Sequence, residues 1–272
     1  MSVIIDGNGV LVMCELFGVN AKYPLEYNEC LREFYSHSPR HPHGWGLATF
    51  DEQGVQIEKE PMQASKSHYL EERLTATVSG KNVLAHIRYA TIGNLEYNNC
   101  HPFTGRDLSG RQWTMVHNGT IFDFEPLKAY TQKQQGSTDS ERIFLYLLSK
   151  MNQALLQKKD SSAGLTYEER FKILDRLVCE MAPHNKLNLL IYDGEYFYVH
   201  TNCEHTLYVA KGEGVAKFAT VPFGTEEWSP VPMTRLLAYK EGELETVGRV
   251  HEKRFVDNPA DYQLLYQIFS DL

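Results

Sequence analysis

The chain has few cysteines, and none of them lie close together in the sequence. Five are present in 272 residues, at positions 14, 30, 100, 179 and 203, and no CxxC pair occurs. An odd number of scattered cysteines disfavours a disulfide framework, and the missing CxxC pair disfavours a zinc site built from thiolates. Free thiols of this kind fit a protein of the reducing cytoplasm best.

Long apolar runs and basic clusters are also missing. No stretch approaches the roughly 18 apolar residues of a membrane-spanning helix, and residues 1–12 include Asp6 but lack the basic start of a secretory signal. The formal net charge is −8 and the isoelectric point is about 5.8. These values argue against a nucleic-acid partner and against binding to an anionic membrane. They leave small polar substrates open.

Apolar residues make up 42% of the chain, which is enough for a sizeable core, and a single globular body is favoured. Helices are expected at 25–35, 66–77, 138–151 and 166–181, and residues 93–112 are expected to be irregular. Strands are expected at 15–19, 47–50, 55–59, 83–91, 113–116, 187–192, 196–200, 207–210, 216–220, 235–239 and 243–250. The order strands, helices, strands favours a layered α+β fold over alternating βαβ units.

Three histidines, His37, His41 and His43, lie within seven residues in the loop 36–46. Imidazoles so close together could bind zinc, but the prolines and glycines of the loop give no regular face and no carboxylate or thiolate stands nearby in it. We therefore favour a rigid loop beside a pocket, with Trp45 as one wall.

Cys14 stands directly after Met13, at the head of a short apolar run. If the chain starts at Cys14, because Met13 is the true start or because residues 1–13 are removed, this residue carries both a thiol and a free α-amine. The amine has a reference pKa of about 7.7 to 8.0, so it can accept the thiol proton and later return it. From residues 13–18 alone, however, a small buried apolar side chain is the favoured interpretation.

Two polar positions follow strands that are otherwise apolar. Arg88 closes the strand 83–91, and a buried guanidinium needs either an acid of the protein or a carboxylate ligand. Asn118 and Gly119 follow the strand 113–116, where an Asn-Gly pair is either a hairpin turn or an oxyanion hole built from a side-chain amide and a backbone N–H. The residues alone leave both alternatives open.

Asp139 is expected in the first turn of a helix that Ser137 or Thr138 caps. An acid at this position interacts favourably with the positive end of the helix dipole. By itself, Asp139 is therefore best interpreted as an ordinary first-turn acid.

Five separated segments are informative in combination. They are MCELFG at 13–18, AHIRYAT at 85–91, CHPF at 100–103, HNGT at 117–120 and STDSE at 137–141. In order and spacing they resemble the class II glutamine amidotransferases, and the resemblance covers nearly the whole chain. It implies the four-layered αββα sandwich of the N-terminal nucleophile hydrolases. It also implies that residues 1–13 are a leader, a propeptide or an upstream-start segment, followed by a single glutamine amidotransferase type-2 domain at 14–272.

The resemblance also implies a role for each matching residue. Cys14 would attack a γ-glutamyl carbonyl to form a thioester, with its α-amine as base and then acid. Asn118 and Gly119 would form the oxyanion hole. Arg88 would hold the substrate α-carboxylate and Asp139 its α-ammonium group.

The histidines within the motifs are left without a proton-transfer role, since the α-amine handles the proton. His86, His101 and His117 are expected to be scaffold or pocket-wall residues, together with Thr91. No cofactor and no metal ion are expected.

The segment Gly44-Trp45-Gly46 and the compact size resemble the stand-alone branch of the family, whose members act on γ-glutamyl compounds, some with a separate protein subunit. The expected function is hydrolysis or transfer at the γ-glutamyl amide of glutamine or of a γ-glutamyl compound. The alternatives are a glutaminase subunit that supplies ammonia to a separate synthase, and a catalytically silent glutamyl-binding subunit. The sequence motifs do not encode the leaving group.

Overall fold

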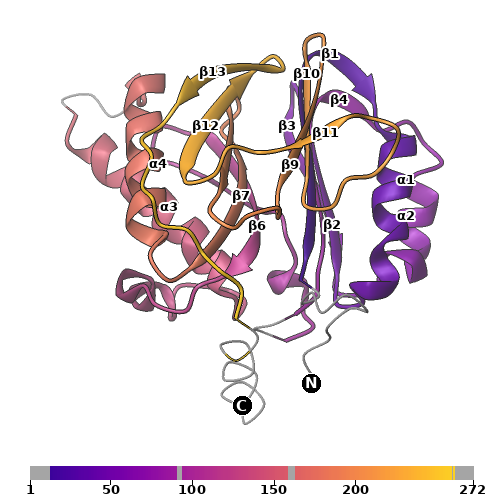
Figure 1. The fold of residues 1–272 in the computed structure, drawn as a ribbon, viewed down its shortest axis with the longest axis horizontal. Helices are drawn as coiled ribbons and strands as arrows, with labels where there is room; N and C mark the ends of the chain where they lie inside the picture. The colour runs from indigo at the N-terminus through magenta and orange to yellow at the C-terminus, as the bar shows by residue number, and fades with distance from the viewer. Residues whose placement is uncertain (1–12, 91–93, 159–162, 259, 261–272) are drawn as a thin grey trace.

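Two antiparallel sheets stacked face to face form the centre of the protein (Figure 1). A computed structural model describes residues 13–90, 94–158, 163–258 and 260. Within these residues, the first sheet has seven strands in the order β11-β9-β10-β1-β4-β2-β3, and the second has six in the order β13-β12-β8-β7-β6-β5.

The strands of the first sheet are β1 (Glu15–Glu26), β2 (Trp45–Asp51), β3 (Gly54–Glu60), β4 (Ser79–Ile87), β9 (Tyr208–Gly212), β10 (Val215–Ala219) and β11 (Trp228–Pro230). The strands of the second sheet are β5 (Phe103–Arg106), β6 (Gln112–Thr120), β7 (Lys186–Tyr192), β8 (Phe197–Thr201), β12 (Arg235–Lys240) and β13 (Glu243–Val247). The helices are α1 (Asn28–Ser36), α2 (His68–Arg73), α3 (Asp139–Leu156) and α4 (Tyr167–Met181), and short 3₁₀ turns lie at Ser38–Arg40, Ala64–Lys66, Tyr97–Asn99 and Glu125–Tyr130.

Helices cover the outer face of each sheet. Figure 1 shows α1 and α2 beside the first sheet and α3 and α4 beside the second, so the layers follow the order αββα. The predicted four-layered sandwich is confirmed. None of the helices that the structure describes is both long and apolar enough to span a membrane.

Each pair of neighbouring layers shares one hydrophobic core. Buried examples, taken from the α1 side to the α4 side, are Phe17 with Leu31, Leu16 with Leu190, and Met115 with Phe144. The strand β1 supplies two of these cores, because side chains alternate between the faces of a strand. Both of its faces are covered at its start, which explains why residues 15–21 are all buried.

The predicted boundaries differ from the structure in several places. The first helix begins at Asn28 because residues 25 and 26 still belong to β1. The second predicted helix is much shorter than 66–77: the side-chain amide of Asn28 donates to the carbonyls of Leu74 and Ala76 and so fixes the chain after α2. The prediction of irregular structure throughout 93–112 was wrong, since Phe103–Arg106 form β5.

One buried histidine of β8, His200, contributes to the pH dependence of stability. His200 is fully buried, its Nδ1 lies 3.0 Å from the carbonyl oxygen of Leu187, and its Nε2 lies 3.0 Å from Nε2 of His251. Burial lowers the pKa of His200 to about 3. The unfolded chain therefore binds a proton below about pH 6.5 that the folded chain does not bind.

We expect the free energy of unfolding to fall as the pH drops below about 6.5. At pH 5, His200 alone should account for about 2 kcal/mol of this loss, since each pH unit below the unfolded pKa contributes about 1.4 kcal/mol. Urea unfolding between pH 5 and 8 measures the slope. His200→Asn should reduce the slope of the unfolding free energy against pH by about 1.4 kcal/mol per pH unit, which corresponds to one proton. His68→Asn, at an exposed position, should leave this slope unchanged. An unreduced slope in His200→Asn would refute the assignment to His200.

Candidate active site

The candidate site lies where the starts and ends of strands from both sheets meet the first turn of α3. Cys14 directly precedes β1, and Tyr89 follows the end of β4, the neighbour of β1 in the first sheet. The Cys14 thiol lies 3.2 Å from the Tyr89 carbonyl oxygen, and the Tyr89 N–H donates to the sulfur at 3.3 Å. The end of β4 therefore fixes the position of the thiol.

The second sheet reaches the same cysteine through Asn118. This residue lies in β6, and its side-chain amide donates to the main-chain carbonyl of Cys14. An asparagine amide carries two N–H donors, so this bond uses one of them. Asn118 and Gly119 lie inside β6, paired with Asn188 and Leu187 of β7, which excludes the hairpin-turn alternative for the Asn-Gly pair.

Only glycine fits at position 119. A Cβ atom there would lie 1.9 Å from the Lys186 carbonyl oxygen and 2.6 Å from Nε2 of His117. Both neighbours are buried and fixed, because that same nitrogen lies 3.2 Å from the Lys186 carbonyl. The glycine therefore lets the backbone of β6 approach β7 closely next to Asn118.

Arg88 and Asp139 place opposite charges near the thiol. Arg88 is 3% exposed and follows β4, and Asp139 is 5% exposed and is the first residue of α3. Burial raises the pKa of Cys14 to about 11, Arg88 opposes this rise, and Asp139 adds to it. At neutral pH the sulfur therefore carries its proton, and a nearby base is needed to form the nucleophilic thiolate.

Asn99, a buried asparagine that the sequence analysis did not single out, connects the partner of Arg88 to the segment just before Asp139. The Asn94 carbonyl accepts hydrogen bonds from Arg88 at 2.9 Å and from the Asn99 amide at 2.9 Å. Asn99 also bonds to the backbone N–H and the hydroxyl of Ser137, just before α3. The only signal for Asn99 in the sequence was its position directly before the CHPF segment.

Asp139 is held by backbone donors. Its two carboxylate oxygens accept hydrogen bonds from the N–H groups of Ile121 at 2.8 Å and Ser140 at 2.9 Å. Thr138 caps the helix, as predicted, with its side chain accepting from the Glu141 N–H. A carboxylate has about four acceptor positions, so these two bonds and the longer one from the Ser140 hydroxyl at 3.5 Å leave capacity for an ammonium group.

The motif histidines are buried and neutral. Burial is the main reason that the pKa values of His86 and His101 lie well below the ordinary value and that of His117 is also lowered. His117 links β6 to α3 through the Ser140 hydroxyl, 2.9 Å from Nδ1. The rings of His86 and His101 are 4.1 Å apart, and their nitrogens have no hydrogen-bond partner among the residues that the structure describes.

One predicted wall residue, Trp45, does not join this group. Trp45 is fully buried on the helix side of β2, where it stacks on Tyr69 and donates to Glu60 at 3.0 Å. Alternation along β2 explains this placement, because Gly46 next to it faces the opposite way, toward the backbone of His101. Thr91 lies outside the described residues.

The three histidines of the loop after α1 have separate partners. His37 Nδ1 lies 2.8 Å from Glu15 Oε2, His41 Nε2 lies 2.7 Å from the Met13 carbonyl oxygen, and His43 Nδ1 accepts from the Ala90 N–H at 2.8 Å. In the described part of the chain, no three side chains of the metal-binding types form a group that could hold an ion. Glu15 and His41 thus border Cys14, which the sequence analysis did not anticipate.

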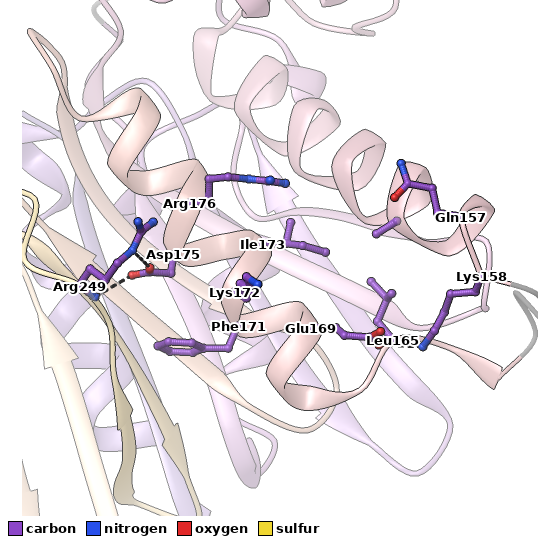
Figure 2. A pocket seen from close by; sticks show the side chains of 11 residues that line it. Gln157, Lys158, Leu165, Glu169, Phe171, Lys172, Ile173, Asp175, Arg176 and Arg249 are labelled. Carbon is purple, nitrogen blue, oxygen red and sulfur yellow. Dashed lines mark hydrogen bonds and ion pairs between the residues drawn. The ribbon is translucent and has the colours of Figure 1, made fainter.

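A separate hollow of about 700 Å³ lies on the outer surface between α3 and α4 (Figure 2). None of the predicted site residues lines it. Two ion pairs line it: Arg249 bonds to Asp175 at 2.8 Å, and Lys158 bonds to Glu169 at 2.7 Å. This hollow is therefore distinct from the candidate site around Cys14.

Comparison with known proteins decides the family. The model of the class II glutamine amidotransferases matches residues 13–213. The chain belongs to this family. It is 31% identical to YafJ of Escherichia coli strain K12 over 196 residues, which cover 70% of the chain and 74% of YafJ. The family assigns a glutamine-type substrate, in agreement with the resemblance described above.

Solved structures share the fold. A "predicted glutamine amidotransferase" from Pseudomonas aeruginosa PA01 aligns with a TM-score of 0.59 at 23% identity, covering 86% of this chain and 100% of that one. The glutamine phosphoribosylpyrophosphate amidotransferase of B. subtilis aligns with a TM-score of 0.62 at 17% identity, covering 87% of this chain and 49% of that one. These structures confirm the predicted fold, and the match to YafJ over 74% of its length confirms the predicted similarity to stand-alone members of the family.

Proposed function

We propose that this amidotransferase hydrolyses or transfers the γ-glutamyl group of glutamine or of a γ-glutamyl amide through a thioester on Cys14. The observation that carries the proposal is the position of Cys14: its thiol is fixed by Tyr89, its carbonyl is held by Asn118, and its pKa responds to both Arg88 and Asp139. A nucleophile, an amide donor and two opposite charges are therefore combined at Cys14.

In this proposal the chain acts with Cys14 as its first residue. The thiol, which burial keeps protonated, gives its proton to the α-amine, and the sulfur attacks the γ-carbonyl carbon. The second N–H of the Asn118 amide and the backbone of Gly119 stabilise the oxyanion. The resulting ammonium then returns the proton to the leaving amine, and water releases glutamate from the thioester.

Two charged side chains bind the charged groups at the glutamyl end of the substrate. The guanidinium of Arg88 binds the α-carboxylate, and the carboxylate of Asp139 binds the α-ammonium group. The network through Asn94, Asn99 and Ser137 keeps these two groups in a fixed relation. Both contacts are made to the glutamyl half of a substrate, so they are shared by glutamine and by larger γ-glutamyl amides.

The experiment that tests this function is glutamate release from a panel of substrates. A chain beginning at Cys14 should release glutamate from glutamine, from glutathione or from another γ-glutamyl amide, and it should spare the matching α-glutamyl amides. Release from none of the γ-glutamyl compounds would overturn the proposal. Binding of glutamate without turnover would instead support a silent glutamyl-binding subunit.

Arg88→Lys should raise KM for the γ-glutamyl substrate by roughly 10- to 100-fold with a smaller effect on kcat. The ammonium of lysine keeps the charge but cannot reproduce the planar fork that matches a carboxylate. Steady-state kinetics at saturating and limiting substrate separate the two parameters. Arg73→Lys, at an arginine that pairs with Glu58, is the matched control and should change neither. An unchanged KM in Arg88→Lys would remove Arg88 from substrate binding.

A further inference from the structure

Beside Cys14 lies a cluster of three polar side chains, Glu15, His37 and His41, which the mechanism above does not use. His41 is 2% exposed and Glu15 is 8% exposed. His37 Nδ1 lies 2.8 Å from one oxygen of Glu15, and His41 Nε2 lies 3.5 Å from the other. Glu15 immediately follows the proposed nucleophile, so the cluster is tied to the start of β1.

The hydrogen bonds of His41 define which ring nitrogen holds a proton. Nδ1 lies 3.1 Å from the main-chain carbonyl oxygen of His37, which can only accept, so Nδ1 must be the donor. In a neutral imidazole, Nε2 then carries a lone pair. In this structure Nε2 lies beside the Met13 carbonyl oxygen and the Glu15 carboxylate.

The Met13 carbonyl oxygen lies close to the Cys14 nitrogen, because both atoms belong to the same peptide group. A carbonyl oxygen and the nitrogen of the same peptide are about 2.2 Å apart, as the standard bond lengths require. His41 Nε2 lies 2.7 Å from that oxygen, so it lies at most about 5 Å from the Cys14 nitrogen. When Cys14 is the first residue, this acceptor is replaced by an amine that has N–H groups to donate.

We propose that Nε2 of His41 accepts a hydrogen bond from the free α-amine of Cys14 and thereby turns the amine lone pair toward the thiol. The inference rests on the function proposed above, because it concerns the base of that reaction. His41 is a positioning residue: it keeps its proton on Nδ1 and neither gains nor loses a proton in the cycle. The thiol proton moves to the amine and from there to the leaving group.

Glu15 and His37 hold the ring in this orientation. The hydrogen bond to Glu15 raises the pKa of His37, so the two groups form an ion pair. A hollow of about 340 Å³ opens on this pair and leaves His37 partly exposed. His37 can therefore be replaced without creating a buried void, whereas His41 cannot.

Several other charged or titratable side chains face the Cys14 and His41 groups and stay constant in the test. They are Glu15, His37, His43, His86, Arg88 and Asp139. Burial lowers the pKa values of His43 and His86, so these two rings are neutral near pH 7. The α-amine, with a reference pKa of about 7.7 to 8.0, therefore contributes to the acid limb of activity near neutral pH, beside His37, whose pKa the hydrogen bond to Glu15 raises.

The test compares His41→Ala and His41→Gln in a chain that begins at Cys14. His41→Ala should lower kcat for γ-glutamyl hydrolysis by roughly 10- to 100-fold and leave KM within about twofold, since proton transfer is misaligned while Arg88 and Asp139 still bind substrate. His41→Gln should recover at least part of kcat, because the side-chain oxygen of glutamine reaches the place of Nε2. His68→Gln, at an exposed histidine outside the cluster, is the control and should leave kcat unchanged.

A second readout follows the amine without any turnover. Selective ¹⁵N labelling of cysteine allows the Cys14 α-amine to be titrated by NMR. An acceptor favours the charged ammonium, so its loss should lower the pKa of the amine. In His41→Ala the NMR titration and the acid limb of kcat/KM should therefore move to lower pH together.

The outcomes separate the two proposals. An amine pKa and a pH profile that both remain unchanged in His41→Ala would overturn the positioning role, even if activity dropped through a packing defect. Equal losses in His68→Gln and His41→Ala would also overturn it. If the parent chain releases no glutamate, the proposed function fails, while the NMR titration still decides whether His41 contacts the amine.

Discussion

Cys14→Ala is expected to abolish glutamate release, with a loss on the order of 10⁶-fold in kcat. Removal of a covalent nucleophile has an effect of this size in hydrolases that proceed through an acyl intermediate, and the remaining groups supply only binding and oxyanion stabilisation. Intact-mass measurement of the quenched reaction should show a glutamyl adduct on the parent chain and none on the variant.

The same substitution should leave the fold intact. Cys14 is partly exposed and lies directly before the start of β1. Its thiol makes only weak hydrogen bonds with Tyr89, so the loss in stability should be below about 1 kcal/mol. Cys179→Ala, at another half-buried cysteine on α4, serves as the control and should keep full activity. Turnover that survives in Cys14→Ala would assign the nucleophile to another residue.

Asn118→Ala is expected to lower kcat by about 10²- to 10³-fold with little change in KM. This is the effect of deleting one donor that is aimed at the developing oxyanion, because such a donor stabilises the transition state more than the bound substrate. Steady-state kinetics with a γ-glutamyl amide give both parameters. A rise in KM with unchanged kcat would instead indicate a ground-state contact with the substrate.

Asn188, directly opposite in β7, provides the control for this variant. It is as buried as Asn118, but its side chain bonds to Thr201 of β8 and to Thr206 in the loop before β9. Asn188→Ala should therefore lower the free energy of unfolding and keep kcat within a few-fold. Equal losses of kcat in both variants would mean that distortion of the β6–β7 pair, and not a missing donor, explains the effect of Asn118→Ala.

The sequence predicted those parts of the fold that depend on local patterns. The capped start of α3 at Thr138 and the long helix α4 follow from side-chain caps and apolar periodicity. The strand β5 was missed because four residues with one buried apolar side chain give no period to detect. Trp45 was misplaced because the direction of a strand residue depends on the register of β2, which the sequence does not show.

The candidate site shows the same division. Cys14, Arg88 and Asp139 were assigned site roles through the resemblance of five segments to the family. The residues alone favoured a buried apolar role for Cys14 and an ordinary first-turn acid for Asp139, and they left Arg88 open. Their proximity is a property of the sandwich, since β1 and β4 belong to one sheet and β6 belongs to the other. Glu15 carried a signal of the same kind as Arg88, because it is a charged residue at the start of an apolar strand. Glu15 is 8% exposed, but only the structure shows that Glu15 lies next to His41.

The most direct test concerns the base. Two chains that differ by one residue, one beginning at Cys14 and one retaining Met13 on its nitrogen, should be incubated with the same γ-glutamyl amide while glutamate release is measured. We expect the chain beginning at Cys14 to be active and the other to be slower by at least about 10²-fold, because its buried thiol has no α-amine to take the proton. Equal rates from the two chains would contradict the role of the Cys14 α-amine.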